Sequence, residues 1–515
     1  MRHKMRINPL IPAKAGIWRR TFRRFWQGIP AFAGMGVLLL FAHAAHAQSE
    51  IDLKSDLAEC KSLVIIGGLP IDCDAAFKGA HLYPLQPHPN EVAWPTGRWE
   101  VGDMPADTAP RVDDLIAVAM AGEKADTMGE TRAVVIIHQG RLVAEAYRAG
   151  FGPTTKQVSW SMAKSITQAL VGRAVHLGLI EDIDAAMPSP FEADDPRAAI
   201  TWRHWLTMTD GLDYKEINAT GLADNDVVNM MYGRGKYDVL AYVEAELPLI
   251  HEPGEHWNYS TAGFHQLGSA LQQVWNEAYP SFRAELSLEA DKDERFQAEN
   301  YELIQAQKAK RYCRDQLIIS GDEAPERCQN LIKKDASGAY ESIEIPFREG
   351  SRRNAIWRQM NLQTALTRFI GMDAQYEYDA AGTFLGGALV WASARDFAKF
   401  GYLYLRDGVW EDERLLPEGW VDFARTKTPA ENANIYGAGW WITAYGEARS
   451  HPQNADSPPW DAFHAGGHEG QTIWVVPSKD LVIVRLGLMS NAGENWEALY
   501  EWNQKIARAF PDVEE

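Results

Sequence analysis

Hydrophobic residues between positions 132 and 147 form two short runs that are typical of paired strands. The runs 132–138 and 142–147 are rich in Val, Ile and Ala, and Gln139-Gly140-Arg141 separates them. Two such runs around a short glycine-containing link predict a hairpin. A second pair, 472–476 and 481–486, flanks the turn sequence 477–480 near the C-terminus. The pattern therefore predicts strands toward both ends of the chain.

The region between these strand pairs has mainly helical periodicity. From Ser161 onward, apolar residues occupy most sides of a helical pattern, which predicts a buried helix that stops at Gly178. Residues 180–385 also have mainly helical patterns, and a further helix is expected at 394–405. Strands at both ends with helices between them predict an α/β layer that is interrupted by a helical lobe.

Composition divides the chain further. A proline-rich stretch within 84–105 and the irregular sequence before it predict an N-terminal arm over 48–94. We expect an α/β domain built from 95–180 and 386–515, and a helical lobe over 181–385. Within the lobe, 276–353 is highly charged, which is typical of solvated helix faces. This insertion is either an ordinary surface excursion or a lid.

The first 47 residues predict an exported protein. They hold eight Lys or Arg and no acid, followed by the apolar run 37–41 and the small-residue sequence Ala45-His46-Ala47. This is the pattern of a secretory signal peptide cleaved near Ala47. The apolar stretch is shorter than the roughly 20 residues that span a bilayer, so an uncleaved anchor is the weaker alternative. We expect a periplasmic or secreted protein without stable membrane insertion after cleavage; twin-arginine export through Arg19-Arg20 stays open.

The net charge narrows the possible binding partners, and the cysteine spacing indicates disulfides. The whole chain carries −19, and without residues 1–47 it would carry −27. An acidic chain without a basic stripe is not expected to bind nucleic acid. The four cysteines form two close pairs, Cys60 with Cys73 and Cys313 with Cys328. In an exported chain this favours two local disulfides over free thiols, and neither pair has zinc-site spacing.

The first candidate catalytic residues lie in Ser161-Met162-Ala163-Lys164, where an exposed loop leads into the predicted buried helix. Residues at i and i+3 are neighbours on a helix. Lys164 can therefore take the proton of Ser161 if burial keeps the amine neutral. A Ser-x-x-Lys sequence is weak evidence alone, and its placement at a helix start is what points to a nucleophile and its base.

Two further elements are candidates for the same chemistry. Tyr259 is predicted at a loop-to-helix junction, where a phenol can serve as a base if a cation such as Lys164 stabilises the phenolate; otherwise it is an aromatic anchor. Phe463 to Gln471 is glycine-rich and precedes a strand, so a carbonyl substrate can approach backbone N–H groups there. The alternative is a plain glycine turn. His464 and His468 have no third metal ligand at suitable spacing, and we expect no metal.

Together these elements resemble the serine β-lactamase and penicillin-binding-protein superfamily, in its branch of class C-like esterases and 6-aminohexanoate-dimer hydrolases. The resemblance covers about 95–510 and implies a central antiparallel sheet flanked by helices, with an inserted, mainly helical lobe. Its parts, in chain order, are Ser161 to Lys164 at Ser-x-x-Lys, Thr201 to Leu212 at a helix-to-loop signature, Tyr259-Ser260-Thr261 at Tyr-x-Asn, Ser393 to Gly401, Tyr436 to Trp441, and Ala465-Gly466-Gly467 at Lys-Thr-Gly.

Two departures from the family pattern affect the expected substrate. Thr261 stands at the asparagine of Tyr-x-Asn, and Ala465 stands at the lysine of Lys-Thr-Gly. The positive charge that meets a β-lactam carboxylate in the family is therefore missing. This argues against an efficient β-lactamase and against a carboxypeptidase, and it favours an esterase or amidase.

The resemblance implies covalent catalysis without a cofactor or metal. Ser161 would attack the carbonyl of a small ester or amide, and Lys164 with Tyr259 would move the proton. The oxyanion would lie between the N–H groups of Ser161 and of His468 after Gly467, with Thr261 beside the substrate. A peptidoglycan peptidase or β-lactamase is the alternative enzyme, and a non-catalytic binding module is the alternative outside enzymes. The sequence does not define an oligomeric state.

Other hydrolase classes fit the sequence poorly. Gly-x-Ser-x-Gly is absent, which disfavours an α/β-hydrolase. His251 and His256 are five positions apart and flank Pro253-Gly254, so they do not form the helical metal-binding pair of a zinc protease.

Overall fold

The computed structural model describes most of the chain after residue 81. The described residues are 82–121, 128–320, 325–334, 365–411, 413–430, 432, 436–442, 461–489 and 496–513. The expected signal peptide and the pair Cys60 and Cys73 lie outside these ranges. The chain divides into two compact units, 274–369 and the remainder, and each is described by itself.

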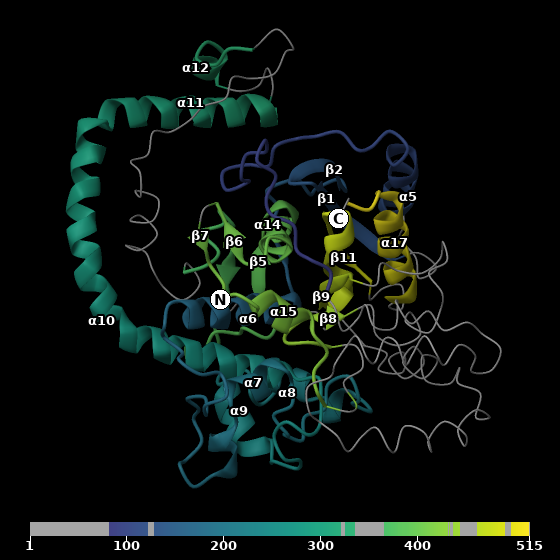
Figure 1. The fold of residues 1–515 in the computed structure, drawn as a ribbon, viewed down its shortest axis with the longest axis vertical. Coiled ribbons are helices and arrows are strands. Elements are labelled where there is room, and N and C mark those ends of the chain that lie inside the picture. The colour runs from purple at the N-terminus through teal and green to yellow at the C-terminus, as the bar shows by residue number, and fades with distance from the viewer. Residues whose placement is uncertain are drawn as a thin grey trace, which may run out of the picture. The chain divides into compact units, whose positions relative to one another are not determined.

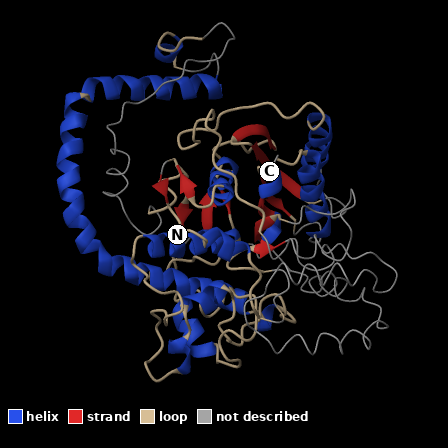
Figure 2. Ribbon diagram, in the orientation of Figure 1, coloured by secondary structure: helices blue, strands red, loops and turns tan. Residues whose placement is uncertain are grey.

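The larger unit contains groups of strands and groups of helices (Figures 1 and 2). The strands are β1 (Glu130–His138), β2 (Arg141–Tyr147), β3 (Gln157–Val158), β4 (Gln375–Tyr376), β5 (Val390–Ala392), β6 (Val409–Trp410), β7 (Glu413–Arg414), β8 (Trp441–Ile442), β9 (Phe463–Gly467), β10 (Gln471–Val476) and β11 (Leu481–Leu488). The α-helices are α5 (Ala109–Ala121), α6 (Met162–His176), α7 (Trp202–Leu206), α8 (Asp226–Met231), α9 (Val239–Glu246), α14 (Ala394–Leu405), α15 (Trp420–Arg425) and α17 (Trp496–Ala509). Short 3-10 helices are η1 (Pro196–Ala199), η2 (Leu222–Asp224), η4 (His468–Gly470) and η5 (Pro477–Lys479).

A six-stranded sheet forms the centre of this unit, in the order β2-β1-β11-β10-β9-β8. Every neighbouring pair is antiparallel, with Val135 opposite Val484 and Trp474 opposite Ile483. The sheet brings the strands from the two ends of the chain together, as β1 pairs with β11. Both predicted strand pairs, 132–147 and 472–486, are confirmed as the hairpins β1-β2 and β10-β11.

Helices cover both faces of the sheet, which explains its long apolar strands. On one face, α5 and α17 pack against β1, β10 and β11 and share a core that includes Val112, Trp474 and Ile506. On the other face, α14 packs against β1, β10 and β11, and α6 packs against β9 and β10. Strands buried on both faces need continuous apolar runs rather than alternation. The α/β class with a central antiparallel sheet between helices is confirmed.

The buried helix predicted from Ser161 is α6. All but its last two residues are buried. The chain leaves the helix at Gly178, whose φ of +71° is a left-handed conformation that glycine adopts without steric cost. The N–H of Gly178 donates to Val175 O and that of Leu179 to Ala174 O, which satisfies carbonyls at the helix end. The stop predicted at this glycine is therefore confirmed.

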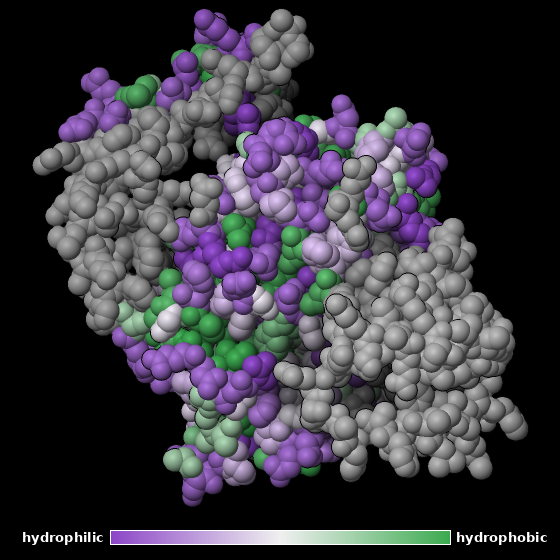
Figure 3. Space-filling view, in the orientation of Figure 1, coloured by the Kyte–Doolittle hydropathy of each residue, from purple (hydrophilic) through white to green (hydrophobic). Residues whose placement is uncertain are grey.

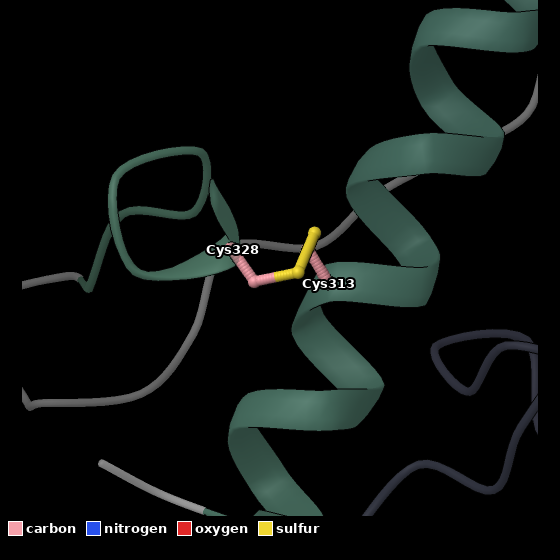
Figure 4. Close-up of a disulfide and its surroundings, with 2 residues drawn as sticks. All are labelled: Cys313 and Cys328. Atoms are coloured by element: carbon pink, nitrogen blue, oxygen red, sulfur yellow. A yellow bond between two sulfur atoms is a disulfide. The ribbon is translucent and has the colours of Figure 1, made fainter. Parts of the chain in front are cut away.

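The smaller unit, 274–369, spans the whole of the predicted charged insertion, 276–353. A long helix, α10 (Thr261–Glu299), begins in the larger unit and continues into 274–369, where α11 (Tyr301–Ser320) and α12 (Glu326–Gln329) follow. The predicted disulfide between Cys313 and Cys328 is present and joins α11 to α12 (Figure 4). Leu317 and Ile332 pack with the two cysteines in a small core.

The described surface mixes hydrophilic and hydrophobic residues on the face that Figure 3 shows. Across the described ranges, no helix combines the length and the apolar character that a membrane span requires. Within the same ranges, no group of three or more His, Cys, Asp or Glu is arranged to hold a metal ion.

Candidate active site

Ser161 lies at the start of α6, where the preceding turn fixes its position. Its backbone has φ −65° and ψ −6°, and its carbonyl accepts the N–H of Lys164 at 3.0 Å. Trp160, directly before it, has φ +45°, which is uncommon for a residue other than glycine. The Ser159 carbonyl accepts the N–H of Met162 at 3.2 Å. The N–H groups of Met162, Ala163 and Lys164 thus all donate to carbonyls of this turn. The donor beside the Ser161 hydroxyl is the N–H of Ser161 itself, directly before the helix.

Lys164 is buried one helical turn after Ser161. Its Nζ lies 2.9 Å from Ser161 Oγ, 2.8 Å from Thr261 Oγ1 and 2.7 Å from the Gly387 carbonyl oxygen. The side chain is 1% exposed. Burial lowers the pKa of Lys164 to about 8, and the charge of Glu216 opposes that shift. The structure thus brings the two residues of Ser-x-x-Lys into hydrogen-bond contact, with an amine that ionises near neutral pH.

Tyr259 lies just before α10 and faces the same pair. Lys164 Nζ is 4.9 Å from the centre of its ring, a cation–π distance. Burial raises the pKa of Tyr259, although a hydrogen bond with Ser161 acts in the opposite direction. The ring also contacts Trp441, Trp257 and Tyr436. The site therefore holds Tyr259 as a neutral phenol within a cluster of aromatic side chains.

The glycine-rich element places β9 against the start of α6. A Cβ atom built on Gly467 would lie 2.2 Å from the Ser159 carbonyl oxygen and 3.2 Å from the Ser161 nitrogen. Only glycine allows this approach. His468 follows as the first residue of η4, and its ring makes an edge contact with Trp160. Ser161, Gly467 and His468 are therefore neighbours, as the predicted oxyanion arrangement requires.

Arg485 on β11 holds the turn that contains His468. The side chain is fully buried and donates to the carbonyl oxygens of Glu469 and Gly470 at 3.0 Å, and to that of Met128 at 2.6 Å. Glu469 has φ +64°. Burial lowers the pKa of Arg485 to about 9, against the charge of Glu469. These bonds stabilise a turn whose backbone is otherwise unfavourable.

Thr261 is the first residue of α10, and its hydroxyl lies between Lys164 and Glu216. Thr261 Oγ1 donates to Glu216 Oε1 at 3.0 Å, and Thr261 N donates to Glu216 Oε2 at 3.0 Å. Sequence reasoning missed Glu216 because an acidic residue in a loop, outside every motif, looks like ordinary surface. It also missed the carbonyl of Gly387, since any residue type supplies a carbonyl.

His464, one of the two histidines considered as metal ligands, packs among aromatic side chains. His464 on β9 is buried, stacks on Trp474 and lies 3.4 Å from the Tyr500 hydroxyl through Nε2. Burial lowers the pKa of His464 to about 3. Ala465, at the position of the family's third-motif lysine, is 0% exposed.

Comparison with known families identifies the class of protein that this fold and site define. Residues 112–286 and 334–507 match the family model described as beta-lactamase. The chain therefore belongs to the beta-lactamase family of serine hydrolases, and the resemblance drawn from its motifs is confirmed. No curated protein sequence matches the chain significantly.

Solved structures similar to the chain include several hydrolases. A proposed 6-aminohexanoate-dimer hydrolase from Bacillus anthracis is 19% identical with a TM-score of 0.48, and the match covers 83% of this chain and 90% of that one. EstCE1, a hydrolase with promiscuous acyltransferase activity, is 17% identical with a TM-score of 0.43, covering 78% and 98%. A beta-lactamase/D-alanine carboxypeptidase from Pseudomonas syringae is 14% identical with a TM-score of 0.43, covering 78% and 99%.

Proposed function

We propose that this protein is an exported serine hydrolase that cleaves a small ester or amide through an acyl-enzyme on Ser161. The single observation that carries the proposal is the buried Lys164, with Nζ 2.9 Å from Ser161 Oγ. A lysine with a pKa of about 8 is about one-tenth neutral at pH 7. That fraction can act as the base for the serine hydroxyl.

Each step has a residue to move the proton. Ser161 Oγ attacks the carbonyl carbon while its proton passes to Lys164 Nζ. The bond to the leaving alcohol or amine then breaks, and the leaving group takes a proton that Tyr259 relays from Lys164. Water next attacks the acyl carbon, gives a proton back through the same groups and frees Ser161. In this proposal Tyr259 works as a neutral phenol, because its burial disfavours the phenolate.

The developing oxyanion is assigned to the N–H groups of Ser161 and His468. Support for this comes from Gly467, whose backbone passes close to the Ser161 nitrogen. Donors that are fixed before the reaction stabilise charge without reorganising, and each can account for about 100-fold in rate.

The surroundings favour acyl groups that lack a carboxylate. Ala465 supplies no charge at the third motif. The aromatic side chains around Tyr259 can contact apolar groups. These features support an esterase or amidase over a carboxypeptidase or β-lactamase.

Release of p-nitrophenol from p-nitrophenyl butyrate tests the proposal. We expect turnover by the wild type and an acyl adduct on Ser161 in the intact mass after rapid quenching. Ser161→Ala should lose both, while Ser189→Ala, which changes a half-buried serine outside every motif, should keep both. Equal rates for wild type and Ser161→Ala would contradict the assignment and favour the binding module. The same assay on periplasmic and cytoplasmic fractions of the producing cells tests the export.

A further inference from the structure

Glu216 occupies a loop outside every recognised motif, yet both of its carboxylate oxygens face the site. Oε2 accepts the backbone N–H of Thr261 and Oε1 accepts the Thr261 hydroxyl, each at 3.0 Å. A negative charge is favourable at the start of a helix such as α10. Ser260 Oγ already accepts the N–H of Gly263 at 3.2 Å. The helix start therefore has a cap of its own, and the contact of Glu216 with the Thr261 hydroxyl goes beyond capping.

This contact fixes the direction of the Thr261 hydroxyl. A hydroxyl has one proton to donate. Because Thr261 gives that proton to Glu216, it can only accept from Lys164, whose Nζ lies 2.8 Å away. The Gly387 carbonyl, 2.7 Å from the same nitrogen, is also an acceptor only.

The two acceptors decide how a neutral Lys164 is oriented. A neutral amine has two hydrogens and one lone pair. With its hydrogens directed to Thr261 and Gly387, the lone pair is left for the third neighbour, the Ser161 hydroxyl at 2.9 Å. This is the arrangement that a base needs in order to take the serine proton.

We propose that Glu216 is a positioning residue that acts through Thr261, holding the Thr261 hydroxyl as an acceptor so that the lone pair of Lys164 faces Ser161. The inference rests on the proposed function, because it gives Glu216 a part in activating the same nucleophile. Without the carboxylate, the Thr261 hydroxyl could turn and donate to the lone pair of Lys164. Lys164 could then no longer accept the proton of Ser161.

Glu216 also brings the negative charge to this site. The other titratable groups that face Lys164 are Tyr259, before α10, and His265, on α10. Burial keeps both neutral, since it raises the pKa of Tyr259 and lowers that of His265 to about 3. The buried Tyr214 and Tyr436, which also feel the charge of Glu216, have pKa values raised by burial. Removing the charge of Glu216 should therefore make Lys164 lose its proton at lower pH.

A double-mutant cycle between Glu216→Gln and Thr261→Val tests the proposal, with kcat and kcat/KM for p-nitrophenyl butyrate measured from pH 5 to 10. We expect Glu216→Gln to lower the plateau of kcat about tenfold in the wild-type background. In the Thr261→Val background, Glu216→Gln should lower the plateau of kcat less than about twofold, because the hydroxyl that Glu216 orients is absent. The acidic limb of kcat/KM should move to lower pH in Glu216→Gln. Glu244→Gln, which removes an exposed charge on α9, should change neither quantity.

Two results would overturn the proposal. One is an equal loss from Glu216→Gln in both backgrounds, which means that the residue does not act through Thr261. The other is an acidic limb that stays in place while activity falls, which is what a purely structural role produces. If Glu216→Gln does not fold, Thr261→Ser and Thr261→Val test the hydroxyl through which Glu216 acts. Higher activity in Thr261→Ser than in Thr261→Val supports the proposal, and equal rates in the two variants refute it. Full activity in Ser161→Ala would instead show that the proposed function itself has failed.

Discussion

Opposing electrostatic effects meet at a single side chain, that of Lys164. Burial disfavours its ammonium form, while the charge of Glu216 and three nearby oxygen atoms favour it. An amine with a much lower pKa would be a weak base for the Ser161 proton. A lysine with its ordinary pKa would be protonated at every physiological pH. The balance leaves a pKa of about 8, which suits a base that must take up and return one proton in each cycle.

The pH dependence of the free enzyme should report this group. Because the base must be neutral, kcat/KM should rise tenfold per pH unit below the pKa of Lys164 and level off above about 8. Lys164→Arg keeps a cation that does not lose its proton in this range, so it should remove activity at all these pH values. Rates of p-nitrophenyl butyrate hydrolysis from pH 5 to 10 measure both. A flat wild-type profile across pH 6 to 9 would exclude Lys164 as the base.

The contact between β9 and the start of α6 matters most among the elements. Gly467 ends β9 directly against the turn that holds Ser161. Its φ is −132°, which any residue can adopt, so the need for glycine at this point is purely steric. Arg485 fixes the turn that follows β9 by donating to the carbonyl oxygens of Glu469 and Gly470. The nucleophile and its proposed oxyanion donors are therefore held by two elements that lie about 300 residues apart in the sequence.

Gly467→Ala should separate these two elements. Its Cβ would meet the Ser159 carbonyl at 2.2 Å, and a displacement of about 1 Å in a catalytic group can cost about 100-fold in rate. Gly466→Ala is the matched control. Its Cβ would meet the side chain of Trp441 at 3.2 Å, which can shift, so a smaller loss is expected. Measured kcat values with thermal unfolding curves compare the variants, and an equal loss of kcat in both would contradict the steric argument.

At the scale of the whole molecule, residues before the sheet are tied to its last hairpin. Arg406, just after α14, pairs with Asp480 between β10 and β11 at 2.5 Å and donates to the Gln86 carbonyl at 3.0 Å. The two charged side chains are 1% and 6% exposed. His88 Nδ1 lies 2.7 Å from the Tyr402 hydroxyl of α14. One buried charged group thus connects three distant parts of the chain.

Asp480→Asn should weaken this connection without changing the backbone. Asp480 has φ +46°, a conformation that Asn tolerates, so the main effect is a buried Arg406 without its counter-charge. Such a change costs about 3–5 kcal/mol in the free energy of unfolding. The neighbouring pair of Lys479 with the exposed Asp512 is a control, and Asp512→Asn should cost less than about 1 kcal/mol. Urea unfolding at pH 7 measures both, and equal losses would refute the argument from burial.

Elements that depend on neighbouring residues could be predicted from the sequence. The hairpins β1-β2 and β10-β11 follow from apolar runs around a short turn, and the end of α6 follows from Gly178. The contact of Ser161 with Lys164 follows from helical spacing alone. The disulfide between Cys313 and Cys328 follows from two cysteines that are close in sequence.

The sequence by itself therefore determined the local elements, the nucleophile with its lysine and, through its motifs, the family. Only the tertiary structure decided which distant groups surround that lysine. Thr261 lies 97 positions from Lys164 and Gly387 lies 223 away, while Glu216 has no motif to mark it. The pairing of β1 with β11 likewise joins strands that are far apart in the sequence. The physical reason is that spacing along a helix or hairpin fixes near neighbours, whereas burial, close approach and charge balance arise only when remote segments pack together.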